Sequence, residues 1–143
     1  MVGIPGSGKS TMAAKISTDL NAKIVSSDAI RAELYGAEET QGNPKEVFAL
    51  YYQRAESFLT QEFDVVLDAT NISKWQRQQA LDLAKRMQAD VYAIVVDPPL
   101  DECIKRNAQR SRHVPEDILK RMYSSLEIPS KEEGYIDVVY IPN

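Results

Sequence analysis

The segment GIPGSGKST runs from Gly3 to Thr11, after only two preceding residues. It contains the spacing G-x-x-x-x-G-K-[ST] that is typical of a phosphate-binding loop. The matching residues are Gly3, Gly8, Lys9 and Ser10. Glycines let successive backbone N–H groups point at phosphate oxygens, and the helix that follows adds the positive end of its dipole. The simpler interpretation is a glycine-rich turn that carries an exposed lysine.

We expect this loop to bind ATP with Mg²⁺. Lys9 is predicted to bridge the β- and γ-phosphates, and the hydroxyl of Ser10 is predicted to hold the metal ion. The residues predicted to contact ATP are Gly3, Pro5, Gly6, Ser7, Gly8, Lys9, Ser10, Thr11, Arg106 and Arg110.

Hydrophobic periodicity predicts helices that alternate with short strands. The predicted helices are residues 10–20 with Asn21 as cap, a short helix stopped by Gly36, a longer one opened by Pro44, one capped by Ser73 and Gln76, one from Leu100 and one from Pro115. The strands lie within residues 22–28, 64–71, 90–99 and 135–141. Residues 37–43 are polar and are expected to be mobile.

Apolar residues at helical spacing predict which helix faces are buried. The three faces are Val47, Tyr51, Ala55 and Phe58; Ala80, Leu83, Ala84 and Met87; and Ile118, Met122 and Leu126. Continuous apolar strands between helices predict an α/β fold, a parallel sheet covered on both faces. In such sheets ligands bind beyond the carboxyl ends of the strands, where Asp28, Asp68 and Asp97 leave theirs. We expect one domain over residues 1–143.

The strand that should lead into the loop is missing. Such a loop normally follows a buried central strand of about five residues, and only Met1 and Val2 precede Gly3. Three explanations are open: the native chain starts upstream of Met1, residues foreign to the native chain complete the sheet, or the strand is very short. We favour the first.

Composition sets further bounds. The chain has 143 residues and a formal net charge of −4, which argues against binding long nucleic acid on a broad basic surface. Cys103 is the only cysteine, so we expect no disulfide-linked partner, and a reducing cytoplasm fits best. No apolar run is long enough to span a bilayer, so we expect no membrane partner.

Candidate residues for a phosphate acceptor follow the second and third predicted strands. Asp28 is placed to accept the proton of an attacking hydroxyl, and Arg31, three residues on, is placed to clamp a phosphate on the acceptor. Asp68 is predicted to hold Mg²⁺ or to orient Arg31, and Asn71 is predicted to bind the acceptor. The alternatives are that Asp28 caps a helix and that Asp68 caps the turn after its strand. Asp97, before two prolines, fits a turn or cap better.

A basic cluster follows in KRNAQRSRHVP. Arg106 and Arg110 are expected on one face of a helix, where two like charges repel and a bound polyphosphate would turn the repulsion into a clamp. Arg110, Arg112 and His113 precede Pro115, so residues 106–118 are expected to form a helical lid over ATP. The alternative is a solvated basic stretch.

The segments GIPGSGKST, SSDAIR, LDATN and RNAQRSRHVPEDILKRMY occur in this order and cover most of the chain. In this it resembles the kinase domain of polynucleotide 5′-kinases of the phage end-repair and bacterial RNA-repair type. The resemblance implies a three-layer P-loop kinase fold, with a parallel five-stranded sheet in the order 2-3-1-4-5 and a helical lid. This chain departs from the family in its truncated first strand. It implies that Asp28 is the general base, that Arg31 contacts an acceptor phosphate, and that Arg110, assisted by Arg106, stabilises the transferring phosphoryl group.

Three functions are open at this point. The first is an ATP-dependent kinase that phosphorylates the 5′-hydroxyl of a polynucleotide end, with Asp28, Lys9 and Arg110 as catalytic residues. The second has the same chemistry with a small metabolite or nucleotide sugar as acceptor. The third is an ATP-binding module without catalysis, which would have no need of a proton acceptor.

Overall fold

The computed structural model describes residues 1–36 and 42–142, so most of the expected mobile segment 37–43 lies outside the described residues. The chain forms two compact units. The first unit consists of Met1–Lys9 and Thr70–Asn143, and the second consists of Ser10–Ala69. The phosphate-binding loop therefore belongs to the first unit up to Lys9. That the chain is one functional domain stays a prediction.

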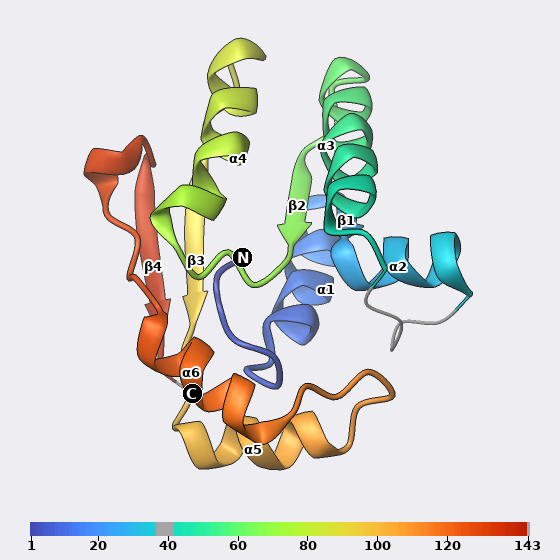
Figure 1. Ribbon diagram of the computed structural model, residues 1–143. Coiled ribbons are helices and arrows are strands. Elements are labelled where there is room, and N and C mark those ends of the chain that lie inside the picture. The colour runs from blue at the N-terminus through green and yellow to red at the C-terminus, as the bar shows by residue number, and fades with distance from the viewer. Residues whose placement is uncertain (37–41, 143) are drawn as a thin grey trace. The chain divides into compact units, whose positions relative to one another are not determined.

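The first unit is built around two parallel strands (Figure 1). Its elements are α4 (Lys74–Arg86), β3 (Tyr92–Val96), α5 (Leu100–Ala108), α6 (Glu116–Ser125), the 3-10 turn η1 (Lys131–Glu133) and β4 (Asp137–Ile141). The register of β3 and β4 runs from Tyr92 opposite Asp137 to Val96 opposite Ile141.

Val2, just before the loop, pairs with β3 in one isolated bridge, and the expectation that the native chain starts upstream of Met1 stays a prediction. Val2 forms a parallel bridge with Val95: its N–H donates to Ile94 O at 2.8 Å, and the N–H of Val96 donates to Val2 O at 2.8 Å. On the other side, the N–H of Gly3 donates to Thr70 O at 2.9 Å. The main-chain groups of this segment are thus satisfied on both sides, as burial requires.

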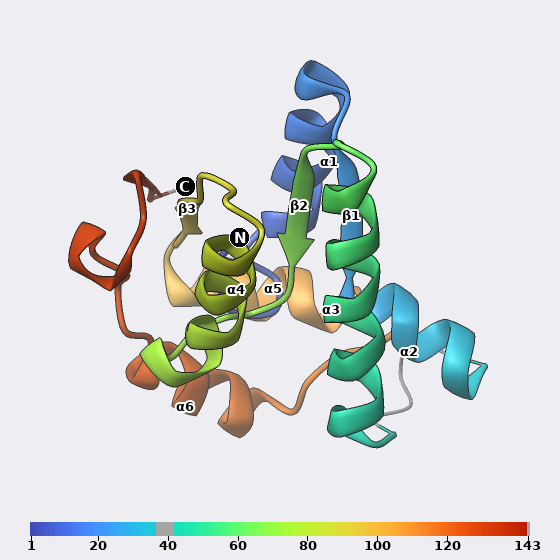
Figure 2. The ribbon, with the colours of Figure 1, turned by 90° about the horizontal axis from the view of Figure 1, so that it is seen from above.

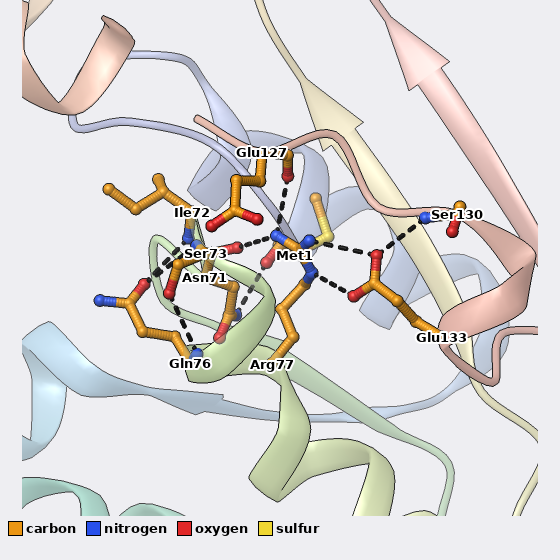
Figure 3. Close-up of polar contacts among 9 residues, drawn as sticks. All are labelled: Met1, Asn71, Ile72, Ser73, Gln76, Arg77, Glu127, Ser130 and Glu133. Atoms are coloured by element: carbon orange, nitrogen blue, oxygen red, sulfur yellow. Dashed lines mark hydrogen bonds and ion pairs between the residues drawn. The ribbon is translucent and has the colours of Figure 1, made fainter. Parts of the chain in front are cut away.

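Asn71 strengthens this attachment. Its side-chain amide donates to the carbonyl oxygen of Met1 at 2.9 Å (Figure 3). Asn71 has a φ of 48°, in the left-handed region that asparagine tolerates better than most residues. The hydrogen bond from the Asn71 side chain and the main-chain hydrogen bonds of Val2 and Gly3 together hold this segment, which is too short to be stable through its strand pairing alone.

The core of the first unit joins the base of the phosphate-binding loop to α5 and α6. Ile4, Ile72, Cys103 and Leu119 are buried together, and Leu100, Ile104, Met122 and Leu126 pack against them. Burial raises the pKa of the Cys103 thiol, so this side chain behaves as a small apolar group.

The second unit contains a second pair of parallel strands. Its elements are α1 (Lys9–Leu20, which begins at the last residue of the first unit), β1 (Lys23–Ser26), α2 (Ser27–Tyr35), α3 (Pro44–Thr60) and β2 (Val65–Asp68). The register of β1 and β2 runs from Lys23 opposite Val65 to Ser26 opposite Asp68. Figure 2 shows α3 running alongside both strands.

Local signals at the helix ends are confirmed. Gly36 ends α2 with a φ of 86°, and Asn21, just after α1, has a φ of 52°. Ser73 and Gln76 form a reciprocal capping box at the start of α4. The hydroxyl of Ser26 accepts the N–H of Ala29 at 3.2 Å and caps α2, so the cap lies two residues before Asp28.

Two predicted helix faces were partly wrong. In α4 the predicted Leu83 and Ala84 are buried, but Arg77 and Leu81 are buried instead of Ala80 and Met87. In α6 the fully buried residue is Leu119, whereas Ile118 is 39% exposed. Periodicity counts apolar residues and so overlooks an arginine whose charge is satisfied in the interior. Of the face predicted for α3, Val47, Tyr51 and Ala55 are buried, whereas Phe58 is only half-buried.

The observed strand pairs test the predicted direction and order of the strands. All pairings described are parallel, and the segment at Val2 neighbours β3, which neighbours β4. The five-strand order 2-3-1-4-5 stays a prediction.

Within residues 1–36 and 42–142, the helices are each too short or too polar to cross a bilayer.

Candidate active site

The phosphate-binding loop has the backbone that its glycines predict. Gly6 and Gly8 have φ values of 81° and 94°, in the region that favours glycine. A Cβ on Gly6 would lie 2.3 Å from the carbonyl oxygen of Cys103 and 3.0 Å from the amide nitrogen of Asn107. The loop therefore rests directly on the backbone of α5, and a larger residue at Gly6 would force the two apart.

Arg106 reaches the loop from α5. Its Nη1 donates to the carbonyl oxygen of Ser7 at 3.2 Å, and its Nη2 forms an ion pair with Glu102 at 3.3 Å. Both side chains of the ion pair are about half exposed. The structure thus brings Arg106 to the loop, and its contact with ATP stays a prediction. The charge of Arg106 is already partly compensated by Glu102, which the prediction overlooked.

The expectation that Arg106 and Arg110 share a helix face is wrong. The helix α5 ends at Ala108, and the N–H of Arg110 donates to Asn107 O at 3.2 Å in a turn beyond the helix. The argument from repulsion at i and i+4 therefore does not hold. Residues between α5 and α6 are irregular, so the region predicted to be a lid consists of two helices joined by an arginine-bearing segment. That it closes over ATP stays a prediction.

One buried hydroxyl of the loop lacks a partner. The Oγ of Ser7 is buried and makes no hydrogen bond within the part of the chain that the structure describes. Unsatisfied buried polar atoms are rare in folded proteins and are found where a ligand or a strained backbone accounts for them. Lys9 is also largely buried, at 8% exposure.

In the second unit, Ser10 and Asp68 form a pair. The hydroxyl of Ser10 donates to Oδ2 of Asp68 at 2.8 Å. Asp68 is 6% exposed, and its Oδ1 is buried without a hydrogen-bond partner among the described residues. A buried carboxylate oxygen without a donor is costly, unless a cation or water satisfies it.

This pair fits a magnesium ion. Hydroxyl and carboxylate oxygens are hard ligands, and protein sites for Mg²⁺ with nucleotides use few side chains, because phosphate and water oxygens complete the octahedron. The unsatisfied Oδ1 of Asp68 is the oxygen that would face the ion. Among residues 1–36 and 42–142, no group of three or more His, Cys, Asp or Glu side chains forms a metal centre of protein ligands alone.

Asp28 and Arg31 form a second pair in the same unit. Nη1 of Arg31 lies 2.9 Å from Oδ1 of Asp28, with the two side chains 8% and 26% exposed. Nε of Arg31 is buried and has no partner within the described residues. Asp28 lies in the first turn of α2, where the positive end of the helix dipole stabilises a carboxylate. The arginine thus keeps one donor for a further acceptor.

Each unit aligns its functional groups at one edge of its strands. Ser26 pairs with Asp68, so the acids Asp28 and Asp68 leave β1 and β2 at the same edge. In the first unit, Val2 leads into the loop beside Val96, the last residue of β3. This agrees with the expected position of ligands beyond the carboxyl ends of strands. That Asp28 faces the loop stays a prediction.

Two predicted residues have visible structural contacts. The amide of Asn71 bonds to Met1, as described above, and its role in binding an acceptor stays a prediction. Asp97 accepts a hydrogen bond from the hydroxyl of Tyr140 at 2.6 Å, which links the end of β3 to β4. This contact does not test the turn or cap role of Asp97, which stays a prediction.

Asn107, which the sequence did not single out, lies directly beside the loop. Its side chain is 5% exposed and makes two hydrogen bonds to the backbone of Val114. The sequence placed it only within the helix predicted from Leu100. An amide at an apolar position of a helix that precedes a loop is the signal that was available.

Comparison with known proteins agrees with this geometry. Residues 1–129 match the AAA domain family. The chain is 25% identical to L-seryl-tRNA(Sec) kinase of Methanococcus maripaludis over 140 residues, which cover 94% of this chain and 54% of the relative. The chain thus spans about half the length of that curated relative.

Two solved structures share the fold. A chain of the Pnkp1/Rnl/Hen1 RNA repair complex superposes with a TM-score of 0.76 at 27% identity, over 87% of this chain and 42% of that one. Kti12 of Chaetomium thermophilum, solved with ADP-AlF3, gives a TM-score of 0.75 at 19% identity, over 99% of this chain and 86% of that one. The chain therefore belongs to the AAA domain family, and it is an α/β domain of the P-loop kinase type.

Proposed function

We propose that this chain transfers the γ-phosphate of ATP to a hydroxyl group, and that the hydroxyl is the 5′-hydroxyl of a polynucleotide end. The observation that carries the proposal is the Asp28–Arg31 pair in α2, where a carboxylate adjoins an arginine that keeps a buried donor. A proton acceptor beside an anion-binding group is what a phosphorylated, hydroxyl-bearing substrate needs. A module that only binds ATP needs neither.

The transfer is an in-line displacement. The acceptor oxygen forms a bond to the γ-phosphorus while its proton passes to the carboxylate of Asp28, and the bond from that phosphorus to the β–γ bridging oxygen breaks to release ADP. Lys9 and Arg110 balance the charge on the moving phosphoryl group, and Arg31 positions the acceptor through a phosphate. The loop amides and Arg106 orient the nucleotide.

Ser10 and Asp68 would hold Mg²⁺, which when bound neutralises charge on the β- and γ-phosphates. The hydrogen bond between them already places both oxygens together, so the pair is preorganised before the ion arrives. Asp68 adds a negative charge that attracts the ion to this side of the nucleotide.

The acceptor is proposed from the named relatives as well as from the motifs. The RNA repair complex and the seryl-tRNA(Sec) kinase both act, by their names, on RNA or on a group that RNA carries. The net charge of −4 is compatible with a short terminus held by Arg31, without contacts along a long strand.

A second candidate keeps the chemistry and changes the acceptor. The match to the seryl-tRNA(Sec) kinase covers 94% of this chain, which favours a hydroxyl other than a 5′ end, such as that of a seryl group or of a small metabolite. In that case Arg31 would bind a different anionic group of the acceptor.

The test is incubation of the chain with γ-labelled ATP and 5′-hydroxyl DNA or RNA oligonucleotides. The proposal expects label on the oligonucleotide, absent with oligonucleotides that already carry a 5′-phosphate and absent with Lys9→Met. Label that appears only on seryl-tRNA or on a metabolite of a cell extract supports the second candidate. Absence of transfer to every acceptor, with ATP still bound, contradicts both.

Asp68→Asn tests the predicted metal pair. The amide keeps the shape and a hydrogen-bond acceptor for Ser10 but loses the charge, so we expect the Mg²⁺ concentration needed for half-maximal ATP binding to rise about 10- to 100-fold. Titration of Mg²⁺ at fixed ATP, followed by calorimetry, measures this. Asp64→Asn, an exposed acid just before the same strand, is the control. An unchanged Mg²⁺ requirement in Asp68→Asn contradicts the assignment.

A further inference from the structure

The segment between α5 and α6 is closed at its base by one side chain. Nδ2 of Asn107 donates to the carbonyl oxygen of Val114 at 2.7 Å, and the N–H of Val114 donates to Oδ1 of Asn107 at 3.0 Å. The amide thus pairs with Val114 as a neighbouring strand would, through one donor and one acceptor. The residues between them, 108–113, include Arg110, and we call them the arginine segment.

Asn107 also adjoins the phosphate-binding loop. Its amide nitrogen would lie 3.0 Å from a Cβ on Gly6, so the loop backbone and this turn of α5 are in direct contact. The carbonyl of Asn107 accepts the N–H of Arg110 at 3.2 Å. One residue therefore adjoins the loop, starts the turn that carries Arg110, and holds the point where the segment returns.

Its neighbours make this position rigid. Asn107 is 5% exposed, and Cys103, one turn earlier in α5, is fully buried against Ile4 at the base of the loop. Leu119, in the helix that follows Val114, belongs to the same core cluster. Both ends of the arginine segment are thus attached to the core that supports the loop, and the side chain of Asn107 joins them to each other.

We propose that Asn107 is a positioning residue: its side chain holds the arginine segment at the loop and so fixes Arg110 for phosphoryl transfer. The proposal rests on the proposed function, because it assigns Arg110 a role in that reaction. Asn107 itself touches no reacting atom. Replacing Asn107 with alanine removes the side-chain partners of the N–H and carbonyl groups of Val114. These two groups then hydrogen-bond to water, and the arginine segment shifts.

The first test compares Asn107→Ala and Asn107→Asp with the wild-type chain. A displacement of about 1 Å at a catalytic group costs on the order of 10²-fold in rate, so we expect turnover to fall by this factor while KM for ATP stays within about threefold. Asn107→Asp keeps the acceptor for the N–H of Val114 but places a carboxylate against its carbonyl, so it is expected to be no better. Gln109→Ala, an exposed residue of the same segment, is the control.

A double-mutant cycle with Arg110→Ala separates positioning from general stability. If Asn107 acts through Arg110, Asn107→Ala lowers turnover much less in the Arg110→Ala background than in the wild-type background. If Asn107→Ala lowers turnover by the same factor in both backgrounds, the proposal is overturned, because the effect of Asn107 on turnover is then independent of Arg110.

Hydrogen exchange makes the test independent of the proposed function. We expect faster amide exchange in residues 108–114 of Asn107→Ala, with exchange in β3 and β4 unchanged. If the wild-type chain transfers no phosphate, the proposed function fails on its own account, and the exchange data then decide whether Asn107 holds the segment. Unchanged exchange in residues 108–114 overturns the proposal, whatever the activity of the chain.

Discussion

Replacing Asp28 with alanine is expected to lower the turnover number of phosphoryl transfer by about 10²- to 10⁴-fold, the usual contribution of a general base. KM for ATP should change little, because the carboxylate acts on the acceptor hydroxyl in the transition state. Steady-state kinetics with ATP and a 5′-hydroxyl oligonucleotide as varied substrates measure both quantities. A large loss of ATP binding instead would show that Asp28 has a structural role.

Two further variants make the result specific. Asp28→Asn keeps an oxygen for Nη1 of Arg31, which lies 2.9 Å from the carboxylate in the native chain, but it cannot accept a proton at neutral pH. It should therefore be as inactive as Asp28→Ala and nearer to wild type in thermal stability. Glu33→Ala is the control: Glu33 is in the same helix, and its ion pair with Arg54 is largely exposed. It should retain activity.

Replacing Arg77 with alanine is expected to lower the free energy of unfolding by about 3–5 kcal/mol, because it leaves a buried carboxylate without its partner. The side chains of Arg77 and Glu133 are 2% and 5% exposed, and Nε of Arg77 lies 3.0 Å from Oε1 of Glu133. Nη1 of Arg77 also donates to the carbonyl oxygens of Asn71 and Glu127, each at 2.9 Å (Figure 3). One guanidinium thus joins three separate parts of the chain.

Thermal and denaturant unfolding measure this effect. For a chain of this size the midpoint should fall by roughly 10 °C or more. Lys85→Ala, an exposed cation in the same helix, is the control and should change the free energy of unfolding by less than about 0.5 kcal/mol. A fall below about 1 kcal/mol for Arg77→Ala would contradict a stabilising role of the buried pair.

The same ion pair makes stability depend on pH. Burial alone would raise the pKa of Glu133, but the hydrogen bonds from Arg77 and from the N–H of Ser130 outweigh it and hold this pKa below its ordinary value. The native state therefore favours the ionised form. The stabilisation from ionised Glu133 is fully present above the pKa that Glu133 has in the unfolded chain. It is lost as the pH falls through the lower pKa that Glu133 has in the folded chain. Arg77→Ala should remove this part of the acid sensitivity, as pH-dependent unfolding would show.

Much of the site followed from short-range patterns. The positive φ values of Gly6 and Gly8 and the helix that begins at Lys9 were predicted from the local sequence, whereas the contacts of the loop with α5 and Thr70 come from distant residues. The capping box at Ser73 and the left-handed glycine at Gly36 also follow from the local sequence. The position of Asp28 and Asp68 at one edge of their strands was also predicted from the sequence, because parallel strands have their carboxyl ends on the same side.

The wrong or missed residues depend on contacts that the helical or strand period does not encode. Arg106 and Arg110 were placed on one helix face from their spacing, but α5 ends at Ala108, where Asn107 turns its amide to Val114. The main-chain partners of the short segment before the loop, in β3 and at Thr70, are remote in sequence, and the expectation that the native chain starts upstream of Met1 stays a prediction.

The local order of residues along the chain was enough to identify a P-loop and the acids that follow neighbouring strands, because hydrogen bonds within a few residues and continuous apolar runs specify such elements. Whether a polar side chain is buried, and what it then bonds to, was settled only by folding. Arg77 is tolerated inside because Glu133, 56 residues away in sequence, accepts its hydrogen bonds, and no local pattern reveals a partner at that separation.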